Sequence, residues 1–365
     1  MDTRTERYQE HARPISPKNP FSELSVEKYL VPVVFPEKDK VVISISEDVQ
    51  CFIPSVLAKK GVICVPLAKA EEYVKSYLKE QSREAVTEAV TNTILSTTGF
   101  FLLVPPNVEV EAKIISYANA LTADKNIIVV EKNSSLKLLH EVQAAGQKTA
   151  RCSAITVIGK EHATITIFHL LYARNEKTNI VENIVLDAHA SLHRVVAHVE
   201  GENLKVHSTI TLAGEYAQVD DKELFLCSKT QQYVFDTIIH HKASYTVSNA
   251  VIKGVAKDAA SCKARGIVRI DKDTKQTSSN LSEHVLLLNK GAKADAIPSM
   301  EIEALDVQAR HSASVSHLDE NQLFYAMARG IPLDEARKMI VFGFLSAVSE
   351  SIPNIQDMLT RKMGE

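Results

Sequence analysis

Residues 240–270 read HHKASYTVSNAVIKGVAKDAASCKARGIVRI and contain two short runs in which apolar and polar residues alternate, NAVIKGVA and ARGIVRI. Alternation with a period of two places one face of a strand in a core and the other toward solvent. The connection between the runs is polar and lacks the Asn-Gly or Asp-Gly pair of a two-residue hairpin. The stretch therefore predicts two strands joined by a corner and not by a hairpin.

Similar runs fill the chain from residue 99 to about residue 318, among them FFLLVPPNVEVEAKI, ATITIFHLL, SLHRVVAHVEG and LKVHSTITL. So many short strands exceed what one β-sandwich usually needs, and non-hairpin corners favour a solenoid whose strands stack coil on coil. No fixed repeat length is visible, and the hexapeptide pattern of left-handed acyltransferase helices is absent. Residues 134–145, SSLKLLHEVQAA, fit either a helix or another coil.

The flanking regions have helical periods. We expect residues 1–97 to be mainly helical, since one helical face gathers Tyr73, Val74, Tyr77 and Leu78 and another gathers Val86, Val90 and Ile94. The core is expected over residues 98–318.

A second helical region is expected over residues 319–365, directly after the alternating run ARHSASVSH. Asp319 is placed to cap a helix together with Gln322, and Gly330 is placed to end it. A following helix should present a face of Ala336, Met339, Ile340, Phe344, Leu345 and Val348. Because a solenoid has an open end, we expect this helical hairpin to cover it.

Composition narrows the class of protein. The chain has 365 residues, 45% hydrophobic and 24% charged, with a net charge of -3. These values indicate a globular protein with no general attraction to nucleic acid or anionic membrane. No apolar run approaches the length of a membrane span and no secretory signal is visible, so we expect a cytoplasmic protein. Five scattered cysteines suit a reducing compartment and are interpreted as small buried residues, Cys51, Cys64, Cys152, Cys227 and Cys262.

The usual catalytic signatures are missing. The chain has no GxxxxGK[ST], GxGxxG, GxSxG or HExxH. Many histidines lie in expected strands, and we interpret most of them as outward-facing polar positions. Glu301 and Glu303 share one strand face, as the two acids of a glycosidase might be placed, but the absence of Trp argues against a sugar-binding cleft.

Two segments resemble the SufB/SufD family of iron–sulfur cluster assembly proteins. They are the opening stretch and ARHSASVSHLDENQLFYAMARGI at residues 309–331. The matching positions are His241, Ser244, Thr246, Ser248, Lys253, Gly254, Arg265, Gly266, His311, Ala313, Gln322, Phe324, Tyr325, Arg329 and Gly330. The resemblance implies a right-handed parallel β-helix flanked by helical regions.

The resemblance also implies partners. A SufC-type ATPase would dock on the C-terminal helices, through Phe324, Tyr325, Arg329, Gly330 and Ile331. The alternative for Phe324 and Tyr325 is packing beneath the helical cap. A SufB-like sister subunit, or a second copy of the chain, would pair through the last strands, which carry Glu301, Glu303, Arg310 and Ser312.

The resemblance points to a SufD-like member. SufB-like chains carry a cysteine at the position that falls on Glu283 here, counting back from Pro298. His311 is present, whereas the glutamate that follows it in SufB-like chains is Ser312. The candidate iron or cluster ligands are therefore His311, the expected metal residue, with Glu283 and His284 as helpers. Interface packing is the alternative for His311.

We thus expect a non-enzymatic scaffold with no stably bound cofactor, at whose subunit interface a cluster resides transiently. The alternatives are a SufB-like or homodimeric scaffold that holds a cluster by itself and, more distantly, a β-helix enzyme acting on polysaccharide.

Overall fold

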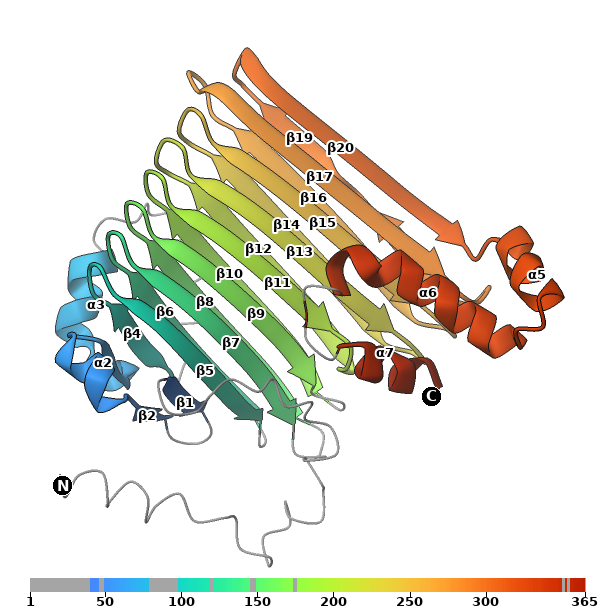
Figure 1. Cartoon of the computed structure of the whole chain (residues 1–365), viewed down its shortest axis with the longest axis horizontal. Helices are drawn as coiled ribbons and strands as arrows, with labels where there is room; N and C mark the ends of the chain where they lie inside the picture. Colours follow the sequence, from blue (N-terminus) through green and yellow to red (C-terminus); the bar gives the residue numbers. More distant parts are fainter. Residues whose placement is uncertain are drawn as a thin grey trace, which may run out of the picture. The chain divides into compact units, whose positions relative to one another are not determined.

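The computed structural model describes residues 40–45, 49–78, 98–118, 121–144, 149–172, 176–349, 352 and 355–364. All belong to one compact unit, residues 35–365. This unit is mainly β, and its strands wind into a parallel β-solenoid (Figure 1). The predicted fold class is confirmed.

Two sheets form the solenoid, and successive strands from β4 to β18 alternate between them. The first sheet has the order β2 (Val49–Phe52), β1 (Val41–Ile45), β5 (Glu109–Ala118), β7 (Ser135–Ala144), β9 (Thr164–Tyr172), β11 (Ser191–His198), β13 (Gln218–Cys227), β15 (Val247–Ala256), β17 (Lys275–Leu287) and β20 (Asp306–His317). The second has the order β18 (Lys293–Ala296), β16 (Ser261–Ile270), β14 (Gln232–His241), β12 (Asn203–Leu212), β10 (Glu176–Leu186), β8 (Thr149–Gly159), β6 (Leu121–Val130), β4 (Phe100–Val104) and β3 (Ile63–Pro66), and β19 (Ser299–Ile302) also pairs with β16. Residues 135–144 thus form strand β7 of a solenoid coil and not a helix.

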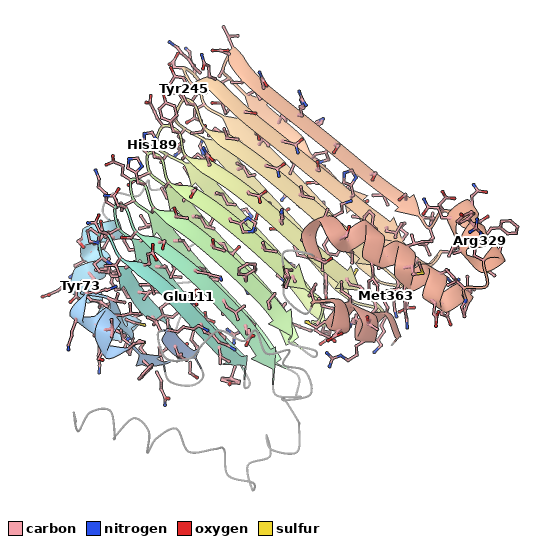
Figure 2. The ribbon with its side chains drawn as sticks, in the orientation of Figure 1. Tyr73, Glu111, His189, Tyr245, Arg329 and Met363 are labelled. Carbon is pink, nitrogen blue, oxygen red and sulfur yellow. The ribbon has the colours of Figure 1, made fainter. Side chains whose placement is uncertain are left out.

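One corner of the coils recurs at unequal intervals along the chain, which is why the sequence shows no fixed repeat. A residue with left-handed backbone recurs there every 26 to 29 positions, as Asn107, Asn133, His162, His189, Tyr216 and Tyr245. Asn and His adopt this conformation more readily than most residues, so a corner can form without glycine. The rings of His162, His189, Tyr216 and Tyr245 stack in sequence with centroids 4.6 to 4.9 Å apart. Figure 2 shows His189 and Tyr245 along this corner.

The solenoid begins earlier than the boundary predicted at residue 98. Within residues 40–78, β1 continues the first sheet by pairing with β5, and β3 continues the second by pairing with β4. This part also contains α2 (Ser55–Lys59), η3 (Leu67–Lys69) and α3 (Glu71–Leu78). The helix predicted around Tyr73 and Tyr77 is α3, and the Tyr73 ring stacks on Phe101 at 5.5 Å. The helix predicted around Val90 lies outside the described residues.

The C-terminal region contains α5 (Glu320–Ala328), α6 (Leu333–Ser349) and α7 (Ile355–Gly364). Asp319 caps α5 by accepting a hydrogen bond from the Asn321 amide at 2.8 Å. Gly330 ends α5 with a φ of 85°, and the amides of Gly330 and Ile331 bond the carbonyls of Met327 and Ala326. This paired arrangement is a Schellman motif, and the predicted helix boundaries are confirmed.

The expectation that these helices cover the open end of the solenoid is wrong. Helix α6 instead packs across the outer face of the first sheet, over β13 and β15 (Figure 1). Its buried residues are Ala336, Val341, Leu345, Val348 and Ser349. Met339, predicted on the buried face, is 57% exposed. Helix α7 is held by a buried ion pair from Lys362 to Glu200 at 3.0 Å. No helix among the described residues has the length and apolar character that a membrane crossing requires.

Candidate functional site

The last coil of the solenoid is exposed. Strand β20 pairs only with β17 among the described strands, and nearly all of its residues are exposed. Register shows which face each residue occupies: His311 pairs with Leu281 and Val315 with Val285, both inside the core. His311, Ala313 and Val315 therefore lie on the interior side of the coil, where no further coil covers them. We call the surface formed by β18, β19 and β20 the open end.

The three ligand candidates do not converge on one site. His284 follows Glu283 in the same strand, so their side chains point to opposite faces of the sheet. Glu283 is on the interior side, diagonal to His311, because it pairs with Ala313. His284 lies on the outer face, where its Nδ1 is 2.7 Å from the Ser314 hydroxyl oxygen. Within the described residues, no group of three or more His, Cys, Asp or Glu side chains could hold a metal ion.

Glu283 is a buried carboxyl with an unusual charge state. Its side chain is fully buried, and neither oxygen has a hydrogen-bond partner among the described residues. Burial raises the pKa of Glu283 to about 7, although the nearby amides of Gly266 and Ile297 partly oppose this shift. Near neutral pH the carboxyl therefore exists in both protonation states at the inner margin of the open end.

A Glu283→Gln variant should reveal this titration as a pH-dependent stabilisation. Because the folded pKa lies above the ordinary value, the wild type loses stability as pH rises from about 4.5 to 7. The variant lacks this loss, so its free energy of unfolding relative to wild type should grow by about 1–2 kcal/mol between pH 5 and pH 8. Urea unfolding at both pH values measures the difference, and exposed Glu303→Gln is the control. An equal effect of Glu283→Gln at both pH values would contradict the raised pKa.

His284 is placed to remain a neutral imidazole. Burial lowers its pKa, and the nearby Lys253 ammonium lowers it further. The Lys253 ammonium itself lies 4.3 Å from the ring centroid of Phe344 on α6. His284 therefore lies beside Lys253, on the outer face that α6 contacts through Phe344, and is not a partner of His311.

The predicted subunit-pairing residues all lie at or beside the open end. Glu301 is in β19 and forms an ion pair with Arg269 at 2.6 Å. Glu303 follows the end of β19 and is exposed. Arg310 and Ser312 are on the outer side of β20, and the Ser312 hydroxyl donates to the Ser282 hydroxyl at 3.2 Å.

The predicted docking residues form an exposed patch on α5. Phe324 is 74% exposed and Tyr325 is 62% exposed, so packing beneath a cap is excluded for both. The Arg329 guanidinium lies over the Tyr325 ring, 4.8 Å from its centroid. Figure 2 shows Arg329 at the tip of the helical region, away from the solenoid. With Gly330 and half-buried Ile331, these residues make up what we call the α5 patch.

A network of charged side chains inside the solenoid was not predicted from the sequence. Arg194, 0% exposed, donates from Nη1 to Asp221 at 2.6 Å and to Glu223 at 2.8 Å. Its Nη2 donates to Glu182 and to the Ser208 hydroxyl. Arg194 lies in β11, Asp221 and Glu223 lie in β13, and Glu182 lies in β10. The four ionisable groups meet because β11 and β13 pair in register, while β10 faces them from the opposite sheet.

Burial and ion pairing oppose each other in setting the pKa values of this network. Burial works to lower the pKa of Arg194, but the carboxylates of Asp221, Glu182 and Glu223 outweigh it and raise that pKa. Burial raises the pKa of Asp221 to about 7 against the opposing effect of Arg194. For Glu182, burial also favours the neutral form, yet Arg194 and His169 hold its pKa below the ordinary range. The Arg194 guanidinium thus faces three carboxyls, of which Asp221 is partly protonated near neutral pH.

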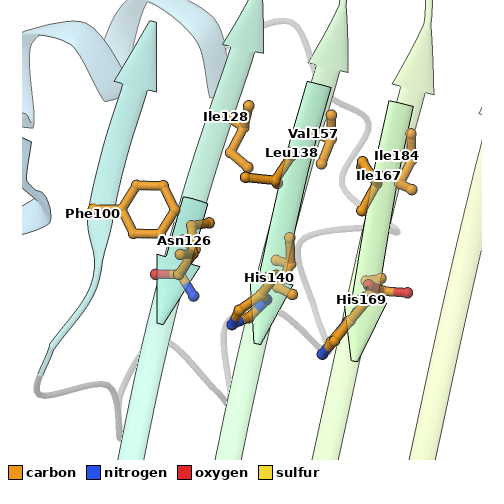
Figure 3. A pocket seen from close by; sticks show the side chains of 12 residues that line it. Phe100, Asn126, Ile128, Leu138, His140, Val157, Ile167, His169 and Ile184 are labelled. Carbon is orange, nitrogen blue, oxygen red and sulfur yellow. Dashed lines mark ion pairs between the residues drawn. The ribbon is translucent and has the colours of Figure 1, made fainter. Parts of the chain in front are cut away.

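Several histidines continue this polar interior, which corrects the interpretation of strand histidines as outward-facing. His140 and His169 stack at 4.6 Å, His169 Nδ1 lies 3.6 Å from Glu182, and His198 is also buried. Burial lowers the pKa of both His140 and His198 well below the usual value. His140, His169 and Asn126 line a cavity of about 10 Å³, close to the space of one water molecule. Figure 3 shows these three side chains.

Comparison with known proteins agrees with this architecture. Residues 113–344 match the family model described as "SUF system FeS cluster assembly, SufBD core domain". The iron-sulfur cluster assembly protein SufD of Bacillus subtilis is 28% identical over 70% of this chain and 60% of its own length. SufBD family proteins of Mycobacterium leprae and Staphylococcus saprophyticus are 26% and 25% identical, over 69% and 70% of this chain. The chain covers 30% and 57% of those two relatives.

The chain thus spans less than two thirds of the length of these relatives, but the family model covers well over half of the chain. Together with the parallel β-solenoid, this match assigns the fold and the family. The chain belongs to the SufBD family of the SUF system of iron–sulfur cluster assembly.

Proposed function

We propose that this chain is a SufD-like scaffold subunit of a complex that assembles iron–sulfur clusters. It pairs with a SufB-like sister subunit through the open end and binds a SufC-type ATPase through the α5 patch. It acts by positioning its partners and not as an enzyme, and any cluster resides only transiently at the subunit interface.

The observation that carries the proposal is the exposed last coil. A solenoid whose final strand has interior-type positions such as Ala313 and Val315 open to solvent carries an unpaired edge and an apolar surface. Such edges lead to pairing with another chain unless they are covered. In this structure the C-terminal helices do not cover it, which supports a role for the open end in subunit pairing.

The position of His311 supports a role at that junction. It lies on the interior side of β20 and would face a subunit stacked on the open end. Imidazole binds iron, whereas Glu283, at the position of the SufB-like cysteine, is buried and supplies no thiolate. We propose that His311 supplies one ligand to iron or to a nascent cluster whose thiolate ligand comes from the partner.

The α5 patch is suited to protein binding because aromatic and Arg side chains supply most of the energy at interfaces. Changing Tyr325 and Arg329 together to alanine should weaken ATPase binding at least about tenfold without loss of stability, because both side chains are exposed. Anaerobic co-purification with SufC-type and SufB-like partners, with the mass of the complex from light scattering, measures the effect. Val56→Ala on α2, also an exposed apolar position, is the matched control.

Two outcomes would redirect the proposal. A chain that runs alone in every combination would remove the partner assignment. Stoichiometric iron and sulfide on the isolated chain, lost in His311→Ala, would favour a homodimeric scaffold that holds the cluster by itself. A polysaccharide enzyme finds no support in the surface pocket beside α2, because Pro54, Val56, Leu57, Lys60, Glu109, Val110, Glu111, Ser135 and Lys137 line it without an aromatic ring.

A further inference from the structure

The cavity of about 10 Å³ beside His140 and His169 lies between the two sheets in the N-terminal half of the solenoid. Figure 3 shows the side chains that line it. None of the lining residues is more than 8% exposed, so the cavity lies inside the core. Its volume is close to the minimum that one water molecule needs and is too small for an organic ligand.

Two polar side chains at this cavity are incompletely hydrogen-bonded. Oδ1 of Asn126 and Nε2 of His169 are buried, and neither has a hydrogen-bond partner among the described residues. Asn126 is 1% exposed and His169 is 2% exposed, so bulk water does not satisfy them. Native proteins pair nearly all buried polar atoms, with ordered water where no protein group is available. The two atoms therefore indicate a ligand in the cavity that they share.

The other atoms of these side chains determine what the ligand must supply. Nδ2 of Asn126 donates to Asp124 Oδ2 at 2.6 Å, which leaves Oδ1 as an acceptor. Nδ1 of His169 lies 3.6 Å from Glu182 Oε1. Burial disfavours the charged form of Glu182, but Arg194 and His169 hold the pKa of this carboxyl below its ordinary range, so it is ionised. A carboxylate only accepts hydrogen bonds, so in the neutral imidazole the proton is on Nδ1 and Nε2 is a second acceptor.

We propose that one ordered water molecule binds in this cavity and donates one hydrogen bond to Asn126 Oδ1 and the other to His169 Nε2. A water molecule has two donors, which match the two acceptors, and it fits the volume. Asn126 is in β6 of the second sheet and His169 is in β9 of the first. The water is therefore a bridge between the two sheets through the core.

The bridging water also joins two buried groups of charged side chains. On one side, Asp124 accepts from Arg151 Nη1 at 3.0 Å and from the Ser153 hydroxyl at 2.7 Å. On the other side, His169 leads through its ion pair with Glu182 to the Arg194 network. The inference is independent of the proposed scaffold function, because neither the open end nor the α5 patch takes part.

A high-resolution crystal structure of the full-length chain tests the site directly. We expect a single density peak about 2.7–3.2 Å from both Asn126 Oδ1 and His169 Nε2. Three results would overturn the inference. They are ordered side chains around a cavity without density, a direct hydrogen bond between the two side chains, and a peak about 2.0–2.2 Å from Nε2, which is the distance of a metal ligand.

Variants that remove one acceptor at a time test which atoms hold the water. His169→Phe keeps a ring of similar size, and Asn126→Leu keeps the branched shape of the side chain. Because a buried water needs at least two polar partners, the peak should disappear in both variants. Ser116→Ala is the control, since it removes a buried hydroxyl that is 2.9 Å from His140 Nε2 and no acceptor of the site. A peak that persists in both acceptor variants would contradict the assigned ligands.

A double-mutant cycle in urea unfolding provides a readout in solution. Either single variant already removes the water, so the variant with both changes should lose less stability than the sum of the two single losses. Asn126→Leu combined with Ser116→Ala should instead give additive losses. Additive losses for Asn126→Leu and His169→Phe would show that no water couples the two side chains.

Discussion

Replacing Arg194 with leucine is expected to lower the free energy of unfolding by about 3–5 kcal/mol. The guanidinium is fully buried and is the cation that bonds Glu182, Asp221 and Glu223. Its removal leaves three carboxyls in a medium where isolated charges are strongly disfavoured, while the lost apolar packing of the side chain is largely replaced by leucine. The ionic contribution should therefore dominate the measured change.

The control for this variant is Arg265→Leu. Arg265 bonds Asp236 at 2.8 Å on the surface of the second sheet, with 44% of its side chain exposed. Exposed ion pairs contribute about 0–1 kcal/mol, so the control should change stability little. Urea unfolding of both variants provides the comparison, and equal losses would show that the buried network does not hold the coils together.

The pH dependence supplies a second readout for Arg194→Leu. Without the guanidinium, the folded-state pKa values of Glu182 and Asp221 should rise, so the folded variant takes up protons as pH falls. Uptake of protons by the folded state stabilises it relative to the unfolded state. The difference in free energy of unfolding between the wild type and the variant should consequently be smaller at pH 5 than at pH 8. A loss of stability caused by packing alone would be the same at both pH values.

Gly254→Ala is expected to cost about 1–3 kcal/mol through overpacking of the core. A Cβ at this position would lie 1.9 Å from Cζ of Phe225, whose buried ring stacks on Phe235 at 4.7 Å. Gly254 pairs in register with Phe225 on the preceding coil, so the ring occupies the space that any larger residue needs. The glycine is required for volume and not for backbone freedom.

A double-mutant cycle with Phe225→Leu isolates this contact. If the clash is the cause, the alanine should cost much less in the Phe225→Leu background than in the wild type. Gly343→Ala on α6 is the control, because no atom lies within 4 Å of its Cβ position and alanine favours helix. Additive losses in the cycle would place the effect of Gly254→Ala elsewhere.

The sequence allowed the fold and both C-terminal helix boundaries to be predicted, because alternation in runs such as NAVIKGVA and the caps at Asp319 and Gly330 act locally. It did not show which strand faces carry polar residues inward. Alternation identifies the buried face of a strand by its apolar residues. A strand such as β11, with Arg194 and His198 on its inner face, therefore does not show locally which of its two faces is buried. The partners that satisfy Arg194 come from other coils and depend on register.

The position of the helices depended on tertiary contacts for the same reason. The helical period of α6 predicted an apolar face but not the surface that receives it, which is the outer face of β13 and β15. Exposure of Phe324 and Tyr325 follows from that choice, since α5 then extends beyond the sheet that α6 covers. Convergence of Glu283, His284 and His311 was excluded only by the register of β17 and β20.

The central claim is that the open end and the α5 patch bind two different partners. Hydrogen–deuterium exchange of the chain alone and with SufB-like and SufC-type partners added in turn measures both surfaces in one experiment. We expect the sister subunit to protect the amides of β20 but not those of α5. We expect the ATPase to protect the amides of α5 but not those of β20. Unchanged exchange in β20 on addition of the sister subunit would contradict the account, because the unpaired edge would then have no role in assembly.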